Sequence, residues 1–274
     1  MSQPDSLVVR ENTGFYRALA AEYDLGREYF YRHERRRIAA DLHWLAGCQP
    51  LAEAQILDVG CGTGFYAEIA AGLGAHHLHC LDLDEAFLAA ARARILSANP
   101  RARVECHLAD LASFAAERAD LLSRIDIYLM GSVLQYVPAA AAQVAALAVP
   151  GRAGFYISST RLPGGGRYPR LEKLLARLDY LAHRLVHPAS RAAARPAAVA
   201  GAAKVTLEVD PAQLNQVLAA AGLQTRWYCY SAFHTALFNW LHGVLRRVWP
   251  TLGSHFTLLA ARGAGVHSKG ERWH

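Results

Sequence analysis

The stretch that decides the fold is "ILDVGCGTGFYAEIA", residues 56–70. An apolar run reaches Asp58, glycines follow at positions 60, 62 and 64, and a helical pattern begins directly after them. Glycine adopts backbone conformations that other residues rarely take, and a helix N-terminus attracts negative charge. The stretch therefore predicts a strand, a turn that brings a ligand against the backbone, and a helix.

From residue 55 onward, short β-like runs alternate with helical segments, which predicts a parallel sheet between layers of helices. We expect strands at 55–59, 77–82, 103–108, 125–130, 153–159, 224–233 and 255–262. We expect helices at 64–74, 84–99, 111–122, 139–148, 170–186 and 210–223, and a helical insert at 237–249. The fold class is α/β, with a seven-stranded, mostly parallel sheet, helices on both faces and a helical cap insertion.

The organisation along the chain follows from where this alternation starts and stops. The predicted units are an N-terminal helical lid (1–50), the ligand-binding core (51–160), a basic helical cap insertion (161–209), the C-terminal part of the sheet with its helical insert (210–262), and a tail (263–274).

The positive charge of the protein is concentrated in one segment. The chain has a formal net charge of +6, whereas residues 161–204 alone hold nine basic and two acidic residues, a net +7. The basic character is therefore a local surface property. It fits a solvated face, attraction of an anionic substrate, or contact with an anionic membrane surface. We favour a cap that covers a substrate pocket. Peripheral membrane contact is less favoured, because the leucine stripe of helix 170–186 must cover apolar surface.

Composition excludes several classes of protein. A chain of 274 residues with 53% hydrophobic and 19% charged residues can bury a sizeable core. No stretch approaches the roughly 18 apolar residues of a membrane span, and the first residues lack a signal-peptide pattern, so we expect a cytoplasmic protein.

Five scattered cysteines indicate reduced thiols. His77 and His79 share one strand face, but a metal site needs a further ligand nearby, so we expect strand packing and no metal.

The spacing of the glycines narrows the choice of ligand. A dinucleotide site of the GxGxxG type needs a small residue where this chain has Phe65. Asp82 ends the second predicted strand, 18 residues after Gly64, where a carboxylate can bind both hydroxyls of a ribose. A ligand that contains a ribose is therefore expected, and a dinucleotide stays open at this point.

Residues 56–160 resemble the class I S-adenosylmethionine (SAM) dependent methyltransferases, which have a Rossmann-like fold. "LDVGCGTG" resembles the first motif of that family, and "LDLDEAFLAAARAR" its second strand and helix. "HLADLASF" resembles the motif on the adenine side, and "DIYLMGSVLQYVP" the fourth strand with the turn beyond it. The resemblance implies SAM as the cofactor.

The resemblance also implies roles for individual residues. Residues expected to bind the cofactor lie in the four motifs: Asp58 at the amino group, Gly60, Cys61, Gly62 and Gly64 at the methionine part, Asp82 at the ribose, Leu83, Asp110 and Leu111 at the adenine, and Met130 and Gly131 near the sulfonium. Residues expected to act in catalysis are Gln135 in the wall near the sulfonium, the aromatic Tyr16, Tyr23 and Tyr136, and a base for a hydroxyl acceptor, with His183, His187 and His234 as candidates.

We therefore expect a methyltransferase that acts on an oxygen or nitrogen of a small molecule. The alternative is a SAM-consuming lyase or cyclase that releases methylthioadenosine by intramolecular displacement. A SAM-binding regulator also remains open, since fold does not fix function. A nucleic-acid methyltransferase would show an NPPY-like motif and basic residues spread along a channel, and the sequence has neither. The acceptor and the oligomeric state are not specified by the sequence.

Overall fold

The structure is a computed structural model, and it describes residues 11–12, 14–16, 24, 28–46, 50–148, 153–160, 174–175, 177–179, 181–182, 207, 209–230, 236–248 and 255–262. The expected helix 170–186 falls mostly outside these residues, as do Tyr23, His183, His187 and His234. Of the expected cap insertion (161–209), the structure describes helical residues within 174–182 and the residues at 207 and 209. The tail 263–274 also lies outside the described part of the chain.

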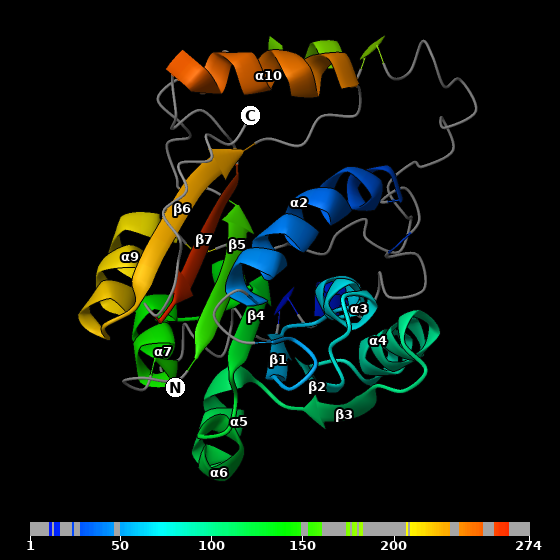
Figure 1. The fold of residues 1–274 in the computed structure, drawn as a ribbon, viewed down its shortest axis with the longest axis vertical. Coiled ribbons are helices and arrows are strands. Elements are labelled where there is room, and N and C mark those ends of the chain that lie inside the picture. The colour runs from blue at the N-terminus through cyan, green and yellow to red at the C-terminus, as the bar shows by residue number, and fades with distance from the viewer. Residues whose placement is uncertain are drawn as a thin grey trace.

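A seven-stranded mixed sheet forms the centre of the protein (Figure 1). Its strands are β1 (Gln55–Val59), β2 (His77–Asp82), β3 (Arg103–Leu108), β4 (Ile127–Gly131), β5 (Gly154–Thr160), β6 (Gln224–Tyr230) and β7 (His255–Ala261). The order across the sheet is β3-β2-β1-β4-β5-β7-β6. β7 lies between β5 and β6 and is antiparallel to both, while all other neighbours are parallel. The predicted seven-stranded, mostly parallel sheet is confirmed.

Helices cover both faces of the sheet, so the fold has three layers (Figure 1). One face packs against α2 (Glu28–Ala46), α3 (Phe65–Gly72) and α4 (Glu85–Ala98), around a core that includes Ile38, Ile56 and Ile95. The other face packs against α5 (Leu111–Glu117), α6 (Ala119–Leu122), α7 (Ala140–Leu147) and α9 (Pro211–Ala220). The side chains of β1 alternate between these two cores, as the period of a strand requires.

Helix α2 is fixed to the sheet by a buried polar cluster. The guanidinium of Arg37 donates to Thr257 on β7 at 2.7 Å and to Tyr228 on β6 at 3.0 Å, and it also contacts Glu34. The Tyr228 hydroxyl donates to Asp41 at 2.6 Å, and burial raises the pKa of Asp41 to about 6. The N-terminal region predicted as a lid thus includes a helix that packs on β5 and β7.

Several expected elements differ in detail, such as the strand expected at 125–130, which is β4 at Ile127–Gly131. The helix expected at 111–122 is divided into α5 and α6, because Arg118 adopts φ −124° and ψ 38°, outside the helical region. The helix expected at 64–74 begins after Gly64, which has a left-handed φ of 81°. The helical insert is present as α10 (Ala236–Val248), which exposes Leu237, Trp240 and Val244. Within the described residues, no helix combines the length and apolar character of a membrane span.

Candidate functional site

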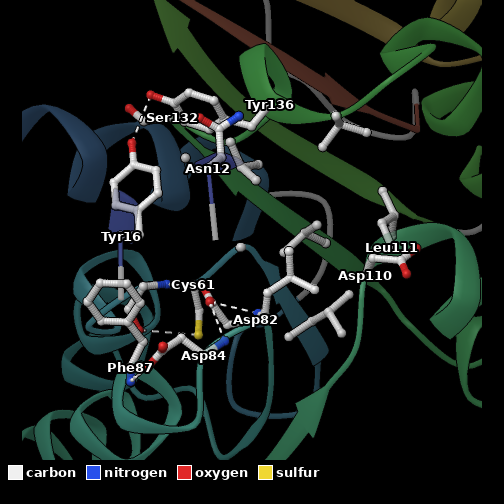
Figure 2. Close-up of a pocket in the computed structure, with 18 of the residues that line it drawn as sticks. Asn12, Tyr16, Cys61, Asp82, Asp84, Phe87, Asp110, Leu111, Ser132 and Tyr136 are labelled. Carbon is white, nitrogen blue, oxygen red and sulfur yellow. Dashed lines mark hydrogen bonds between the residues drawn. The ribbon is translucent and has the colours of Figure 1, made fainter. Parts of the chain in front are cut away.

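A cavity of about 320 Å³ opens where β1, β2 and β4 end (Figure 2). Ligands of open α/β sheets bind at this carboxyl edge, at the point where the strand order reverses. Here β1 is the first strand, with β2 on one side and β4 on the other. The cavity therefore lies at the switch point of the sheet, where ligands of this fold class bind.

The glycines of the turn after β1 serve different purposes. Gly60, Gly62 and Gly64 all have positive φ, at 62°, 52° and 81°. A Cβ on Gly60 would lie 2.2 Å from Cγ2 of Val133, and a Cβ on Gly64 would lie 2.7 Å from Cα of Ala91 on α4. A Cβ on Gly62 would meet nothing within 4 Å. Gly60 and Gly64 therefore allow close packing, whereas Gly62, which lines the cavity, has open space beside it.

Asp82 links the glycine turn to the end of β2. Its Oδ2 accepts the backbone N–H of Gly62 at 2.8 Å, and its Oδ1 accepts those of Leu83 at 2.8 Å and Asp84 at 3.1 Å. Burial raises the pKa of Asp82, while these three hydrogen bonds act to lower it. Each carboxylate oxygen has two acceptor sites and Oδ1 already accepts two N–H groups, so the remaining site on Oδ2 can accept a hydroxyl of a ligand in the cavity.

Asp58 lies behind the glycine turn and does not line the cavity. Its Oδ2 accepts the backbone N–H of Ala67 at 3.2 Å, while its Oδ1 is buried and accepts no hydrogen bond within the described part of the chain. Burial, with a smaller effect from the charge of Asp82, raises the pKa of Asp58 to about 8. A buried carboxylate oxygen without a partner is costly, and a cation nearby would relieve that cost.

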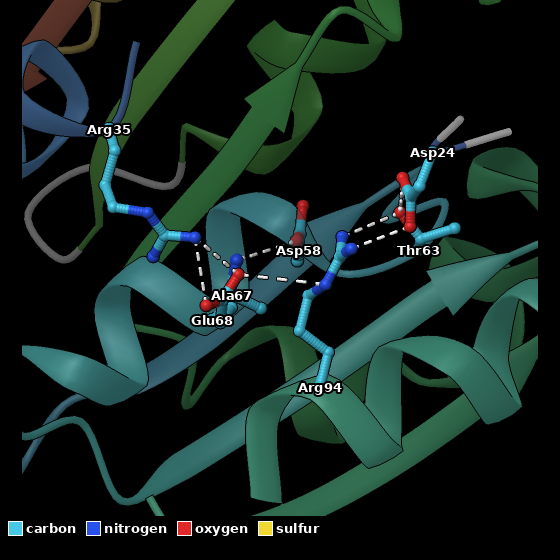
Figure 3. A network of polar contacts seen from close by, with 7 residues as sticks. All are labelled: Asp24, Arg35, Asp58, Thr63, Ala67, Glu68 and Arg94. Carbon is cyan, nitrogen blue, oxygen red and sulfur yellow. Dashed lines mark hydrogen bonds and ion pairs between the residues drawn. The ribbon is translucent and has the colours of Figure 1, made fainter. Parts of the chain in front are cut away.

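The first turn of α3 is tied to the N-terminal region by a chain of ion pairs (Figure 3). Arg94 on α4 binds Asp24 at 2.6 Å and Thr63 in the glycine turn at 2.9 Å, and Asp24 accepts from the Thr63 hydroxyl at 2.9 Å. Arg35 on α2 binds Glu68 at 2.9 Å, and Glu68 also lies 3.7 Å from Arg94. Residues far apart in sequence thereby hold the glycine turn in place.

The end of β3 and the start of α5 form the side of the cavity that the resemblance assigns to adenine. Asp110 is the N-cap of α5 and accepts the backbone N–H of Ser113 at 2.9 Å and the Ser113 hydroxyl at 2.7 Å. Burial acts to raise the pKa of Asp110, but these hydrogen bonds hold it below its ordinary value. Its side chain thus shapes this edge, and Leu111 and Leu83 present apolar surface beside it.

Two tyrosines meet above the cavity (Figure 2). The hydroxyl of Tyr16 donates to that of Tyr136 at 2.9 Å, and their rings are edge to face with centroids 5.6 Å apart. Tyr16 also contacts the ring of Phe87 on α4, and Asn12 lines the cavity beside it. The cavity is therefore bordered by an N-terminal segment, by the helix after β2 and by the turn after β4.

The wall after β4 has two residues with unusual backbone conformations. Ser132 and Ala139 have φ of 57° and 50°, which non-glycine residues rarely adopt, and both line the cavity. Gln135 is buried, donates to the Ser132 carbonyl at 2.8 Å and accepts from the Ser159 hydroxyl at 2.6 Å. Gln143 lines the cavity, and its buried Oε1 accepts no hydrogen bond from the described residues. The strained turn is held by Gln135, and Gln143 offers an acceptor to a ligand.

The structure brings most of the residues singled out in the sequence to this cavity. Those that line it are Gly60, Cys61, Gly62, Asp82, Leu83, Asp110, Leu111, Gly131, Tyr16 and Tyr136. Those buried behind it, in the turn or the core, are Asp58, Gly64, Met130 and Gln135. Sequence reasoning missed Asn12, Phe87 and Gln143, which have no motif around them and reach the cavity only through the fold.

Cys61 in the cavity is a thiol at neutral pH. A hydrogen bond with Cys80 acts to lower the pKa of Cys61, but burial and the nearby carboxylates raise it to about 11. A thiolate is the nucleophilic form of cysteine, so this residue is not an activated nucleophile.

The comparisons with known proteins concern the same part of the chain. Residues 56–151 match the family model described as a methyltransferase domain. The chain is 33% identical over 126 residues to a ubiquinone biosynthesis O-methyltransferase from Aromatoleum aromaticum, covering 46% of this chain and 50% of that protein. It is 35% identical over 107 residues to the protein of the same name from Thiobacillus denitrificans, covering 39% and 44%. The chain thus spans about half the length of the curated relatives it matches.

The fold is shared with a solved structure at much lower identity. Magnesium protoporphyrin IX methyltransferase from Synechocystis PCC 6803, solved with bound SAM, aligns with a TM-score of 0.52 and 15% identity, over 92% of this chain and 97% of that one. The sheet order, the glycine turn with Asp82 and the family match over residues 56–151 agree with one another. Residues 56–151 are therefore similar to a methyltransferase domain, and the chain shares the Rossmann-like fold of that solved structure, as the sequence motifs predicted.

Proposed function

We propose that the protein is a SAM-dependent methyltransferase that acts on a small molecule. The observation that supports this most strongly is the open space at Gly62 next to the carboxylate of Asp82, on one side of a single cavity. Backbone can approach a ligand at Gly62, and Asp82 can accept a ribose hydroxyl. The buried Oε1 of Gln143 lines the cavity and fits an amino group that SAM would bring, while the buried Oδ1 of Asp58, behind the glycine turn, would act on such a group through a bridging water.

Bound SAM supplies a methyl group already activated by its sulfonium. The chain's own residues then position the reactants and exclude water, and positioning can provide ~7–11 kcal/mol of the barrier reduction. Asp82 and the Gly62 backbone hold the cofactor at the sheet edge. The rings of Tyr16 and Tyr136 face the cavity, where they can stabilise a cation and orient an acceptor by their hydroxyls.

An apolar hydroxyl-bearing molecule is the acceptor that the cavity favours. Its outer lining includes Phe87, Val133, Val137 and the two tyrosine rings. The relatives whose names refer to O-methylation favour oxygen over nitrogen as the acceptor atom. No histidine is among the described residues that line the cavity, so a base from the region of His183 stays a prediction of the sequence, as does a cytoplasmic location.

Product analysis tests the proposed reaction. The protein is incubated with SAM alone and with SAM plus a panel of phenolic, carboxylate and amine acceptors, and the products are identified by mass spectrometry. We expect S-adenosylhomocysteine only when an acceptor is present, at least tenfold above the reaction without one. Methylthioadenosine formed from SAM alone would instead identify a lyase or cyclase.

Protonation of Asp58 should be linked to SAM binding. Its pKa of about 8 means that the free protein holds a proton there at pH 7. An ammonium group nearby favours the charged carboxylate, so the pKa falls and the proton is released on binding. We expect SAM affinity to rise by up to about tenfold per pH unit from pH 6 toward 8.

Calorimetry in two buffers of different ionisation enthalpy measures that release directly. Wild type should release close to one proton at pH 7, and Asp58→Asn, which has no proton to lose, should release none from this group. Equal proton release in both proteins would place the cofactor's amino group elsewhere.

A further inference from the structure

A cluster of metal-ligand side chains lies on the sheet outside the cavity. His79 is on β2, and Glu105 and His107 are on the edge strand β3. His79 pairs directly with Glu105 in the register, and His107 follows two residues later on the same strand face. One nitrogen or oxygen from each of the three lies within 4.8 Å of the others. None of the three lines the cavity described above.

The distances within this cluster also fit a coordination shell. Nδ1 of His79 lies 3.3 Å from Nε2 of His107, within hydrogen-bond distance, and 3.6 Å from Oε2 of Glu105. Bonds of about 2.0–2.1 Å in a tetrahedral shell place neighbouring ligand atoms roughly 3.3–3.5 Å apart. The distance of 3.6 Å is too long for a direct hydrogen bond.

A further side chain fixes the orientation of His79. Its Nε2 lies 3.1 Å from Oε1 of Gln55 on β1. A carbonyl oxygen only accepts, so Nε2 bears the proton and Nδ1 turns its lone pair toward Glu105 and His107. A metal-bound histidine commonly donates its other N–H to an oxygen in this way. Burial lowers the pKa of His79 to about 4 and also lowers that of His107.

The charges around the cluster are balanced. Arg118 and Arg124 are close enough to affect His79, and both pair with one acid, Asp120, at 3.7 Å and 3.6 Å. Glu105 supplies the second negative charge, so two arginines are matched by two carboxylates. His79 is 4% exposed, while the Glu105 side chain is 63% exposed, so the cluster opens to solvent on one side. Water can complete a shell there.

We propose that His79, Glu105 and His107 bind a divalent transition-metal ion of the zinc class. Two imidazoles and one carboxylate are a ligand set that zinc uses with an open fourth position. The ion would join the edge strand β3 to β2. Because none of its ligands lines the cavity, it would stabilise the fold without entering the proposed reaction. From sequence we expected no metal at His77 and His79; the strand register adds Glu105 and His107 to His79, and the proposal departs from that expectation.

Calorimetric titration of the chelator-treated, untagged full chain with ZnCl₂ tests the site. Wild type should bind one ion with a melting temperature that rises on binding. Glu105→Gln and His107→Gln should each weaken zinc binding at least about tenfold. Mutation of residues that only contact a metal ligand already weakens metal binding by about that factor, so loss of a ligand should weaken it at least as much. His43→Gln, an exposed histidine on α2, is the matched control and should bind as wild type does.

Cobalt substitution separates this site from the cysteines. Co²⁺ bound by nitrogen and oxygen gives visible d–d bands without the near-ultraviolet charge-transfer band of a thiolate. Glu105→Gln is the decisive variant, because its exposed side chain can change without disturbing the core; circular dichroism without metal verifies its fold. Absence of stoichiometric binding, unchanged affinity in folded Glu105→Gln, or a thiolate band would each overturn the proposal.

Discussion

Replacing Asp82 by alanine should lower SAM affinity at least about tenfold while the protein stays folded. The carboxylate accepts three backbone N–H groups and, in the proposed complex, a ribose hydroxyl as well. A hydrogen bond to a charged group contributes about 1.5–3 kcal/mol, so the loss of one corresponds to roughly 10- to 150-fold. Calorimetric titration with SAM measures the loss.

Asp210→Ala is the matched control for Asp82→Ala. Asp210 also accepts a backbone N–H, from Ala212 at 2.8 Å. However, it caps α9 and does not line the cavity at the ends of β1, β2 and β4. Its removal should cost about 1 kcal/mol of stability and leave SAM affinity unchanged. If Asp82→Ala is folded and binds SAM as wild type does, the ribose assignment is wrong.

Replacing Gly64 by alanine should destabilise the whole domain. The new Cβ would lie 2.7 Å from Cα and 2.8 Å from Cβ of Ala91, and the residue would keep a φ of 81°. The left-handed conformation costs roughly 1–2 kcal/mol and overpacking about 1–3 kcal/mol. Together they remove a large share of the typical ~5–15 kcal/mol of unfolding free energy. The melting temperature should fall by roughly 10 °C, measured by calorimetry.

Two other glycines separate backbone strain from crowding. Gly74 has a φ of 98°, and a Cβ added there would meet nothing within 4 Å, so Gly74→Ala should show the strain alone, a smaller fall in melting temperature. Gly62→Val should fold less stably and lose SAM binding, because its side chain would occupy the cavity. Equal melting temperatures for Gly64→Ala and Gly74→Ala would refute the packing role of Gly64.

The ends of β1, β2 and β3 were predictable to the residue because each is a short run bounded by turn residues. The division of helix 111–122 was not, since its cause is the backbone conformation of Arg118. α2 was not separated from the lid because the contacts of Arg37 with β6 and β7 join residues about 200 positions apart.

The site shows the same difference between local and distant information. The motifs identified Asp82 and the glycine turn, because each lies in a short local pattern at the end of a predicted strand. They did not distinguish Gly62 from Gly60 and Gly64, since the distinction depends on Val133 and Ala91, which reach the turn only in the fold. Likewise, His79 alone does not predict a metal ligand; the strand register that adds Glu105 does.

The position of β7 sets an order of events during synthesis. Among the described strands, β6 is at the edge of the sheet and pairs only with β7. β7 also pairs with β5, so β6 is joined to the rest of the sheet only through β7. While the ribosome is still adding residues 255–261, β6 has no strand to pair with, whereas the strands from β3 to β5 can already assemble. The nascent chain therefore exposes an unpaired β6 until β7 emerges. If translation stalls or the chain is cleaved before residue 255, the sheet lacks β7, and the unpaired edges of β5 and β6 are prone to aggregation.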